Sequence, residues 1–335
     1  MKALVIGASG FLGLNVVDAL RDAGHEVRAT RRKKTITVLL RKRGVELTDA
    51  SLDDEDSLAR AMSGCEVAYL TGAFYPRYSL DREGSIATGV MQVRRACRAA
   101  RSAGVRRLVY TSSVATVAPR VDGRPGTEDD RFDAAPGDSV YRDVKWAMEQ
   151  ELDRWTASGL DAVTLLPGGC IGPWDLRAGT SALLLGVIRR ELPWWVDGLV
   201  NLVDVGDVAS AHVRAAGPLE HRRYCLAGHS VRVGELLRQV ARRYGGGLPP
   251  DPVSPADARD RSDRDEREAS RVKGRVPVPR ELVDLVLTGR PISNARAERD
   301  LGMQFRPLES SLDRAHEWFV RFRYLPGGRT RETVA

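Results

Sequence analysis

The sequence predicts an α/β fold in which a doubly wound parallel sheet carries helices on both faces and a smaller portion follows toward the C-terminus. Three observations support this prediction. Short apolar runs alternate with helical patterns over the first 175 residues, a glycine-rich turn directly follows the first run, and the alternation loosens after about residue 175. Alternating strands and helices are typical of parallel sheets. We therefore expect a first domain over residues 1–175 and a second portion over residues 176–330, some of whose segments return to the first.

The composition is that of an ordinary globular protein, with 42% hydrophobic and 29% charged residues among 335. The first predicted strand begins at Ala3, which leaves no room for a signal peptide, and no apolar run approaches the roughly 20 residues of a membrane helix. The four cysteines are widely spaced and form no CxxC pair, which argues against a zinc site or a disulfide framework. We expect a cytoplasmic protein with no membrane partner and no bound metal.

The positive charge of the chain raises the question of a nucleic-acid partner. The formal net charge is +7, but the basic residues are mostly arginines scattered among acids, with local clusters only at 31–34 and 41–43. No run of aromatic residues is set among basic ones, as a base-stacking surface would need. Solvated surface charge is therefore favoured over nucleic-acid binding.

The first predicted strand, residues 2–6, runs straight into a turn that contains Gly7, Gly10 and Gly13, and a helical pattern follows. Glycines at such a junction allow a tight turn and let backbone N–H groups approach a pyrophosphate, which the positive end of the helix dipole attracts. The spacing is GxxGxxG rather than GxGxxG. Strand, turn and helix together predict a dinucleotide site, and a purely structural turn is the alternative.

The second predicted strand, residues 25–30, ends in Arg31, Arg32, Lys33 and Lys34. A site for NAD usually offers a carboxylate here to the ribose 2′-hydroxyl, and that carboxylate would repel a 2′-phosphate. Four cations in its place favour NADP(H) over NAD(H), with a guanidinium as the best phosphate ligand. A solvated loop is the alternative.

Residues 45–47 and 66–71 predict the third and fourth strands, the second of which ends in the small residues Gly72 and Ala73. Phe74 and Tyr75 follow at the carboxyl edge of the sheet, where ligands bind in doubly wound folds. These two aromatic residues are candidates for substrate contact. A role in capping the core stays equally open.

The fifth predicted strand, residues 107–111, follows a helix predicted over residues 86–103 and runs into Thr111, Ser112 and Ser113. A serine at the end of this strand can hydrogen-bond the substrate oxygen that a nearby acid protonates. The sequence therefore places a candidate polarising hydroxyl just ahead of the next helix.

Tyr141 and Lys145 lie four residues apart at the start of that helix, which is predicted to continue to about residue 155. Residues at this spacing share a helical face. An ammonium group beside a phenol stabilises the phenolate and lowers its pKa from about 10 toward the working pH of a general acid–base. A surface tyrosine beside a solvated lysine is the alternative, and the preceding glycine turn and serine favour the catalytic interpretation.

The sixth predicted strand, residues 162–166, ends in a turn that begins at Pro167 and includes Cys170. Six strands with interleaved helices then complete the doubly wound sheet. Shortly after this turn, Trp174, Trp194 and Trp195 are candidates for an apolar wall against a substrate, and core packing is at least as consistent with them.

The remaining chain is less regular. Residues 201–205 predict a short strand and residues 207–215 a helix. The segment 251–273 is dense in Asp, Arg and Ser, and it predicts either a solvated helix or a mobile excursion.

With these motifs in place, the chain resembles the extended short-chain dehydrogenase/reductases, a family with a Rossmann-like fold. It is similar above all to their dihydroflavonol-reductase-like and NAD-dependent epimerase/dehydratase branch, over nearly the whole chain. The resemblance implies that Tyr141 is the general acid–base, that Lys145 binds the nicotinamide ribose and lowers the Tyr141 pKa, and that Ser113 polarises the carbonyl. Ser112 is the alternative to Ser113 if the register slips by one residue.

The resemblance also implies a set of cofactor contacts along the carboxyl edge of the sheet. They are Gly7, Ser9, Gly10, Phe11, Leu12, Gly13, Arg31, Arg32, Lys33, Ser51, Leu52, Thr71, Gly72, Ala73, Thr111, Tyr141, Lys145, Pro167 and Cys170. The expected substrate contacts are Phe74, Tyr75, Ser113, Tyr141 and Trp174.

Two positions depart from the family pattern. The acid-Leu pair that usually follows the third strand is Ser51-Leu52 here, so the adenine contact is expected from a hydroxyl or from Asp53. The asparagine often found on the helix after the fourth strand corresponds to Ile86, which puts a water relay to Tyr141 in doubt.

These features predict an NADPH-dependent reductase that transfers hydride to a ketone of a small, apolar or aromatic metabolite, with a C-terminal portion that binds the substrate. A sugar-nucleotide epimerase or dehydratase that retains NAD is the first alternative. It is less favoured because Ser113 has no acidic neighbour and the second strand ends in cations. A non-catalytic NAD(P)-binding sensor is the second alternative, and the intact Tyr-Lys pair argues against it. The family resemblance further implies a possible homodimer, paired through the helices at about 86–103 and 141–155.

Overall fold

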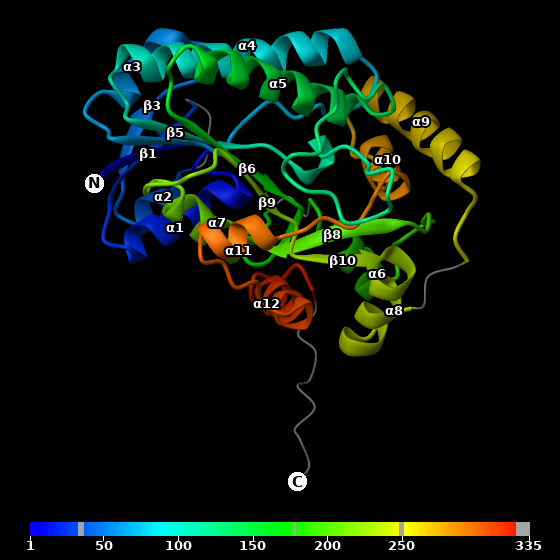
Figure 1. The fold of residues 1–335 in the computed structure, drawn as a ribbon. Helices are drawn as coiled ribbons and strands as arrows, with labels where there is room; N and C mark the ends of the chain where they lie inside the picture. The colour runs from blue at the N-terminus through cyan, green and yellow to red at the C-terminus, as the bar shows by residue number, and fades with distance from the viewer. Residues whose placement is uncertain (33–36, 177–178, 248–250, 326–335) are drawn as a thin grey trace.

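The computed structural model describes residues 1–32, 37–176, 179–247 and 251–325. Its centre is a seven-stranded parallel sheet with the order β3-β2-β1-β4-β5-β6-β9 (Figure 1). The strands are β1 (Lys2–Ile6), β2 (Glu26–Arg31), β3 (Glu46–Asp49), β4 (Val67–Leu70), β5 (Arg107–Thr111), β6 (Ala162–Pro167) and β9 (Arg223–Leu226). The predicted fold class, a Rossmann-like doubly wound α/β fold, is confirmed.

Helices cover both faces of this sheet (Figure 1). One face carries α3 (Glu55–Met62), α4 (Arg82–Ser102) and α5 (Val140–Ala157), and the other carries α1 (Phe11–Asp22), α2 (Val38–Lys42), α7 (Val205–Arg214) and α11 (Ala295–Asp300). The alternation of side chains along β1 explains the two layers. Ala3 and Val5 pack in the core on the α1 side, whereas Leu4 and Ile6 pack in the core beneath α3, α4 and α5.

A second, three-stranded sheet with the order β10-β8-β7 supports the rest of the chain. Its strands are β7 (Gly169–Ile171), β8 (Leu199–Asp204) and β10 (His229–Arg232). A separate hydrophobic core joins this sheet to α6 (Ala182–Arg189), α8 (Val233–Tyr244), α10 (Arg280–Leu287) and α12 (Leu308–Arg321). Trp194 and Trp195 are buried in this second core. The second sheet therefore begins at Gly169, directly after the sixth strand.

The seventh strand of the large sheet, β9, was not predicted from the sequence. It is only four residues long and begins with Arg223, a residue that usually indicates a surface. Here Arg223 is buried and its guanidinium donates to the Glu149 carboxylate at 3.1 Å. The sequence pattern does not reveal this strand, because the acid that neutralises Arg223 lies 74 residues away in the chain, on α5.

The charged segment 251–273 forms a helix, α9 (Pro255–Val272), rather than a mobile excursion. Ser254 caps its N-terminus by accepting a hydrogen bond from the Asp257 amide. Ala258, Ser262 and Glu266 recur every four residues and are buried, which gives the helix one inward face that packs beside α10. Its many other charges point to solvent.

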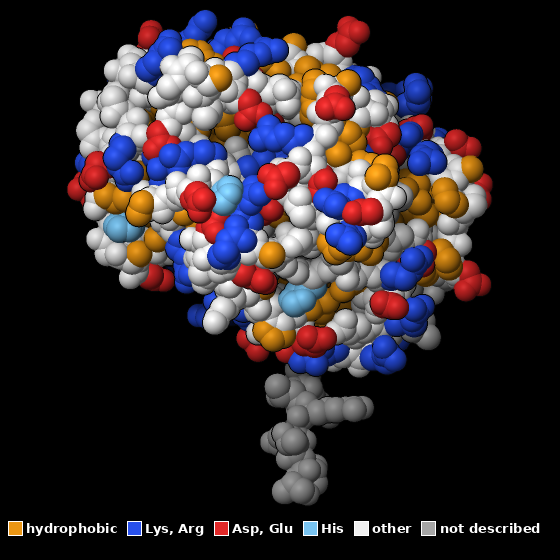
Figure 2. All heavy atoms as spheres, viewed as in Figure 1, with side chains coloured by type: hydrophobic (Ala, Val, Ile, Leu, Met, Phe, Trp, Pro, Cys, Tyr) orange, Lys and Arg blue, Asp and Glu red, His pale blue; other side chains and the backbone are white. Residues whose placement is uncertain are grey.

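No helix in the described part of the chain is both long and apolar enough to cross a lipid bilayer. Figure 2 shows Lys and Arg side chains interleaved with Asp and Glu over the visible face. On that face, the charges do not gather into one basic surface.

Candidate active site

A first cavity of about 500 Å³ lies where β1 and β4 are neighbours and the order of the strands reverses. In open α/β sheets, ligands bind at this switch point, outside the carboxyl ends of the strands. We call this cavity the glycine cleft. Its walls include most of the predicted cofactor contacts, namely Gly7, Ser9, Gly10, Phe11, Leu12, Gly13, Arg31, Arg32, Ser51, Leu52, Thr71, Gly72 and Ala73.

The glycines of the turn let two stretches of backbone approach each other closely. Gly7 has a φ of +87°, which favours glycine, and a Cβ atom there would overlap the backbone of Gly72. A Cβ atom on Gly13 would overlap the carbonyl oxygen of Gly7. The cleft therefore has a floor of bare backbone that side chains would fill.

The N-terminus of α1 points its unpaired amide groups toward this floor. The N-cap residue, Gly10, has no side chain to accept from them. The first amides of a helix have no partner within the helix, and they carry the positive end of its dipole. The cleft therefore suits the pyrophosphate of a dinucleotide.

At the end of β2 the cleft is lined by Arg31 and Arg32, but only one of these two cations is free of an acidic partner among the described residues. The Arg31 guanidinium pairs with Asp49 at 2.7 Å, because β2 and β3 lie side by side in the sheet. Asp49 itself does not line the cleft, so its carboxylate neutralises Arg31 without facing the cavity. Arg32 lines the cleft and has no ion-pair partner among the described residues, and Lys33 lies outside them.

An acceptor that the sequence did not indicate lies at the same end. The side chain of Gln92, on α4, lines the cleft and donates to Asp53 at 3.1 Å. Its buried Oε1 has no hydrogen-bond partner among the described residues. A free amide oxygen beside Ser51 and Asp53 suits the exocyclic amine of an adenine ring. The donors and acceptors of the cleft therefore fit a bound dinucleotide.

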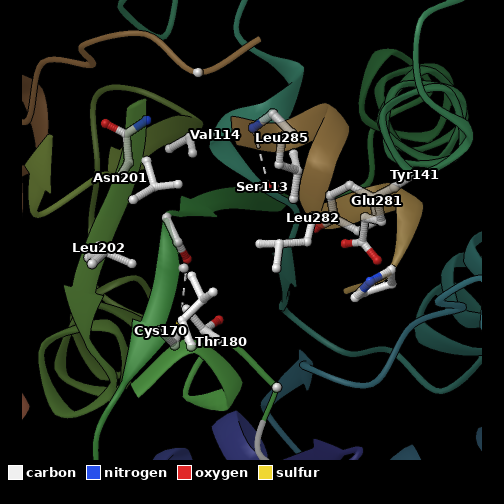
Figure 3. Close-up of a pocket in the computed structure, with 18 of the residues that line it drawn as sticks. Ser113, Val114, Tyr141, Cys170, Thr180, Asn201, Leu202, Glu281, Leu282 and Leu285 are labelled. Atoms are coloured by element: carbon white, nitrogen blue, oxygen red, sulfur yellow. Dashed lines mark hydrogen bonds between the residues drawn. The ribbon is translucent and has the colours of Figure 1, made fainter. Parts of the chain in front are cut away.

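A second cavity, of about 460 Å³, lies between the carboxyl end of the large sheet and the C-terminal portion (Figure 3). We call it the apolar cavity. Most of its walls are aliphatic, and they include Val114, Leu183, Leu192, Leu199, Val200, Leu202, Val276, Leu282, Leu285 and Ile292. Pro167 and Cys170 line it, and Tyr75 lines both this cavity and the glycine cleft. The two cavities therefore adjoin at Tyr75.

Ser113 and Tyr141 meet at one side of the apolar cavity (Figure 3). Ser139 caps α5, so that Tyr141 falls in the first turn of the helix. The Ser113 side chain lies close enough to the Tyr141 hydroxyl to lower the Tyr141 pKa. Ser112, the alternative, also lines the cavity, but its hydroxyl donates to the Glu149 carboxylate. The structure thus brings Ser113, and not Ser112, to the tyrosine.

Lys145 is buried, and its ammonium nitrogen lies 5.9 Å from the centre of the Tyr141 ring. Burial lowers the pKa of Lys145 to about 8. The Tyr141 pKa moves in the direction opposite to the prediction. Burial raises it above its usual value, and the carboxylate of Glu281 raises it further. The phenol therefore holds its proton firmly at neutral pH.

Glu281, on α10, is a second residue that the sequence did not indicate. It lines the apolar cavity next to Tyr141 and is only 7% exposed (Figure 3). Burial raises the pKa of its carboxyl group to about 8. No motif surrounds it, and it lies 140 residues after Tyr141 in the chain. Only the folded structure brings the two together.

Two predicted contacts, Trp174 and Thr111, have other partners. Trp174 lines neither cavity, because its ring packs against Trp318 and Phe322 and under the guanidinium of Arg43. The Thr111 hydroxyl shares a 2.7 Å hydrogen bond with the buried His212 ring.

Phe74 lines the glycine cleft and not the apolar cavity. Lys145 lies behind the walls of both cavities, in neither lining. Ile86, the position that departs from the family pattern, packs against the hydrophobic core beneath α4.

Comparison with known proteins identifies the family. The model of the NAD dependent epimerase/dehydratase family matches residues 3–230. A Synechocystis sp. protein provisionally named dihydroflavonol 4-reductase is 29% identical over 334 residues, which cover 96% of this chain and 95% of the relative. Sterol demethylase protein B of Methylococcus capsulatus is 30% identical over 247 residues, or 73% of this chain and 75% of the relative.

Solved structures agree with this assignment. A crystal structure of a nucleoside-diphosphate-sugar epimerase from Pseudomonas aeruginosa is 25% identical and superposes with a TM-score of 0.81, covering 97% of this chain and 99% of the other. The chain therefore belongs to the NAD dependent epimerase/dehydratase family and is an NAD(P)-dependent oxidoreductase.

Proposed function

We propose that this protein is an NADPH-dependent reductase that transfers hydride to a ketone, or a related C=X group, of a small apolar or aromatic metabolite. One observation carries the proposal. Ser113 and Tyr141 both face an apolar cavity that adjoins the glycine cleft at Tyr75. A carbonyl group in this cavity would meet two hydroxyl donors beside many aliphatic side chains.

The residues of the chain then have distinct roles. The bound cofactor supplies the hydride. Ser113 donates a hydrogen bond to the carbonyl oxygen, and Tyr141 transfers its proton to that oxygen as negative charge develops there. The aliphatic walls exclude water, which strengthens both interactions. Lys145 binds a ribose hydroxyl of the cofactor and favours the phenolate that Tyr141 becomes.

The preference for NADPH rests on Arg32. Arg31 already pairs with Asp49, whereas Arg32 lines the glycine cleft without an ion-pair partner among the described residues. A free guanidinium at the end of β2 can bind the 2′-phosphate with two hydrogen bonds.

The substrate class rests on the walls of the apolar cavity. Leu183, Leu282 and Leu285 face it together with other aliphatic side chains. Burial of rings and hydrocarbon of a substrate against such a lining favours binding by about 25 cal/mol per Å² of apolar surface. Relatives named for dihydroflavonol and sterol chemistry support the same class.

The test is a fluorescence titration of the purified protein with NADPH and, separately, with NADH. Tighter binding of NADPH to protein that carries no retained cofactor is the expected result. Loss of NADPH absorbance with 1-tetralone or dihydroquercetin would then establish reduction. Tightly retained NAD, or a preference for NADH, would contradict the proposal.

The alternative, a sugar-nucleotide epimerase with retained NAD, is favoured by one observation. Arg275 and Arg290 both line the apolar cavity, and the buried Nη1 of Arg290 has no hydrogen-bond partner among the described residues. A diphosphate could pair with these guanidinium groups. Conversion of UDP-glucose to UDP-galactose, followed by NMR, would support this alternative over the reductase.

A further inference from the structure

Glu281 has an unusual position for an acidic residue. It lies in the first turn of α10, faces the apolar cavity beside Tyr141, and leaves only 7% of its surface exposed (Figure 3). It forms no ion pair with any described Lys or Arg. A buried carboxyl group without a cationic partner is costly as an anion, so it retains a proton.

Its neighbours come from four elements. Tyr75, in the loop after β4, and Lys145, on α5, both favour the ionised form of Glu281. Tyr141, also on α5, lies next to Glu281 (Figure 3). The two acids nearby, on α9 and α10 itself, are Glu266 and Asp284.

These two acids have other partners. Glu266 accepts from the backbone amides of Ser79 at 2.6 Å and Arg280 at 2.9 Å. The Asp284 carboxylate pairs with the Arg280 guanidinium at 2.9 Å. Glu281 is thus the acid in this group whose side chain faces the apolar cavity.

Tyr75 connects this buried acid with solvent. The residue as a whole is 58% exposed, although its hydroxyl is buried enough to raise its pKa, and it lines both cavities. Its ring centre lies 5.5 Å from that of Tyr141. A hydroxyl can accept one proton while it donates another, so Tyr75 can pass a proton from water to Glu281.

We propose that Glu281 holds the reserve proton that restores Tyr141 after each turnover. This inference rests on the proposed reductase function. Hydride adds to the carbonyl carbon, the Tyr141 O–H bond breaks, and its proton forms the new O–H bond of the alcohol. The phenolate then takes the proton of the Glu281 carboxyl group, directly or through one water. The Glu281 carboxylate recovers a proton from solvent through the Tyr75 hydroxyl.

The electrostatics of the site agree with this role. The pKa of Glu281, about 8, keeps its carboxyl group largely protonated at neutral pH. Tyr141, whose pKa is raised, takes up a proton readily once it has given one away. The transfer from acid to phenolate is therefore downhill.

The test compares the first turnover with those that follow, using NADPH and whichever of 1-tetralone and dihydroquercetin the wild type reduces faster. Glu281→Gln should leave the first turnover within about threefold of wild type, since Tyr141 starts with its proton. Its steady-state kcat should fall by about tenfold or more, within the usual worth of positioned proton transfer. The trace should then show a burst of one product per site, and Glu281→Asp should restore most of kcat.

Tyr75→Phe gives a second variant that keeps the buried carboxyl group. It should also slow steady turnover more than the first turnover. The matched control is Glu266→Gln, which alters a neighbouring buried acid outside the apolar cavity and should leave the ratio of the two rates unchanged.

An unchanged ratio in both Glu281→Gln and Tyr75→Phe would overturn the inference alone. A wild-type protein that reduces neither ketone would overturn it together with the proposed function.

Discussion

The glycine cleft and the apolar cavity lie side by side but are built in different ways. The glycine cleft is formed by backbone and short loops at the ends of neighbouring strands, most of them within the first 75 residues. The apolar cavity draws its walls from the segment after β5 and from α5, β6, β7, α6, β8 and α10, and its lining residues run from Tyr75 to Ile292. A site made of backbone depends on a few glycines, whereas a site made of side chains can change its specificity one residue at a time.

The largest expected effect separates chemistry in the apolar cavity from binding in the cleft. Tyr141→Phe should lower kcat by ~10² or more, given the usual worth of general acid catalysis, while leaving the Kd for NADPH nearly unchanged. Tyr69→Phe is the matched control, because the buried Tyr69 hydroxyl has no partner among the described residues. Turnover that survives in Tyr141→Phe would remove this residue from the mechanism.

Two buried groups should respond to pH in opposite directions, one in the core of the large sheet and one in the apolar cavity. Burial beneath the large sheet lowers the His212 pKa from 6.5 to about 4. Below pH 6.5 the unfolded chain takes up a proton that the native state refuses, so stability falls by about 3 kcal/mol between pH 6.5 and 4. Urea unfolding across this range should show a flatter profile for His212→Gln. An equally steep profile would assign the loss to other groups.

Glu281, in the apolar cavity, has the reverse effect. Its pKa is raised from 4.5 to about 8, so the native state keeps a proton that the unfolded chain releases. Stability from this group is therefore lost as pH rises from 4.5 to 8. Urea midpoints of Glu281→Gln should decline less over that range than those of the wild type, and a parallel decline would mean that the carboxyl group ionises normally.

A smaller effect tests the cationic end of the glycine cleft. Replacing Arg31 and Arg32 together by Ala should weaken NADPH far more than NADH. Arg32→Ala alone should cost about tenfold in NADPH affinity, as one charge-assisted hydrogen bond does, whereas Arg31→Ala should cost less because Arg31 already pairs with Asp49. Fluorescence titration measures cofactor affinity in all three variants. An equal loss of affinity for NADPH and NADH would mean that Arg31 and Arg32 are solvated charges with no role in binding the 2′-phosphate.

The smallest expected effect concerns the aliphatic walls. Leu285→Val removes one methylene from the apolar cavity, which is worth about 0.8 kcal/mol, or roughly a fourfold rise in KM for an apolar ketone. The Kd for NADPH should stay the same. A change in cofactor binding instead would mean that the two cavities do not act independently.

The same contrast explains what the sequence could predict. The strand-turn-helix at Gly7 is contiguous, so its spacing alone indicated the glycine cleft, and all the predicted residues from Gly7 to Ala73 within the described chain line it. Tyr141 and Ser113 could also be predicted. Tyr141 follows from the helical repeat of α5, and Ser113 from its position just after the end of β5.

The features that the sequence did not predict depend on tertiary contacts. Glu281 and Gln92 belong to no local motif, and only the packing of α10 and α4 against the sheet brings them to a cavity. Trp174 was predicted at the substrate, but its partners Trp318 and Phe322 lie more than 140 residues further along the chain. The expected fall in the Tyr141 pKa failed because burial, which no residue pattern quantifies, raises this pKa instead.

The most direct test of the account follows the hydride itself. The protein would be incubated with NADPH that carries deuterium at both positions of C4 of the nicotinamide and with an apolar ketone such as 1-tetralone, and the product would be examined by mass spectrometry. The account predicts an alcohol with one deuterium on the carbinol carbon and one NADP⁺ formed for each alcohol. Unlabelled product, or UDP-sugar conversion with NAD retained through the cycle, would contradict it.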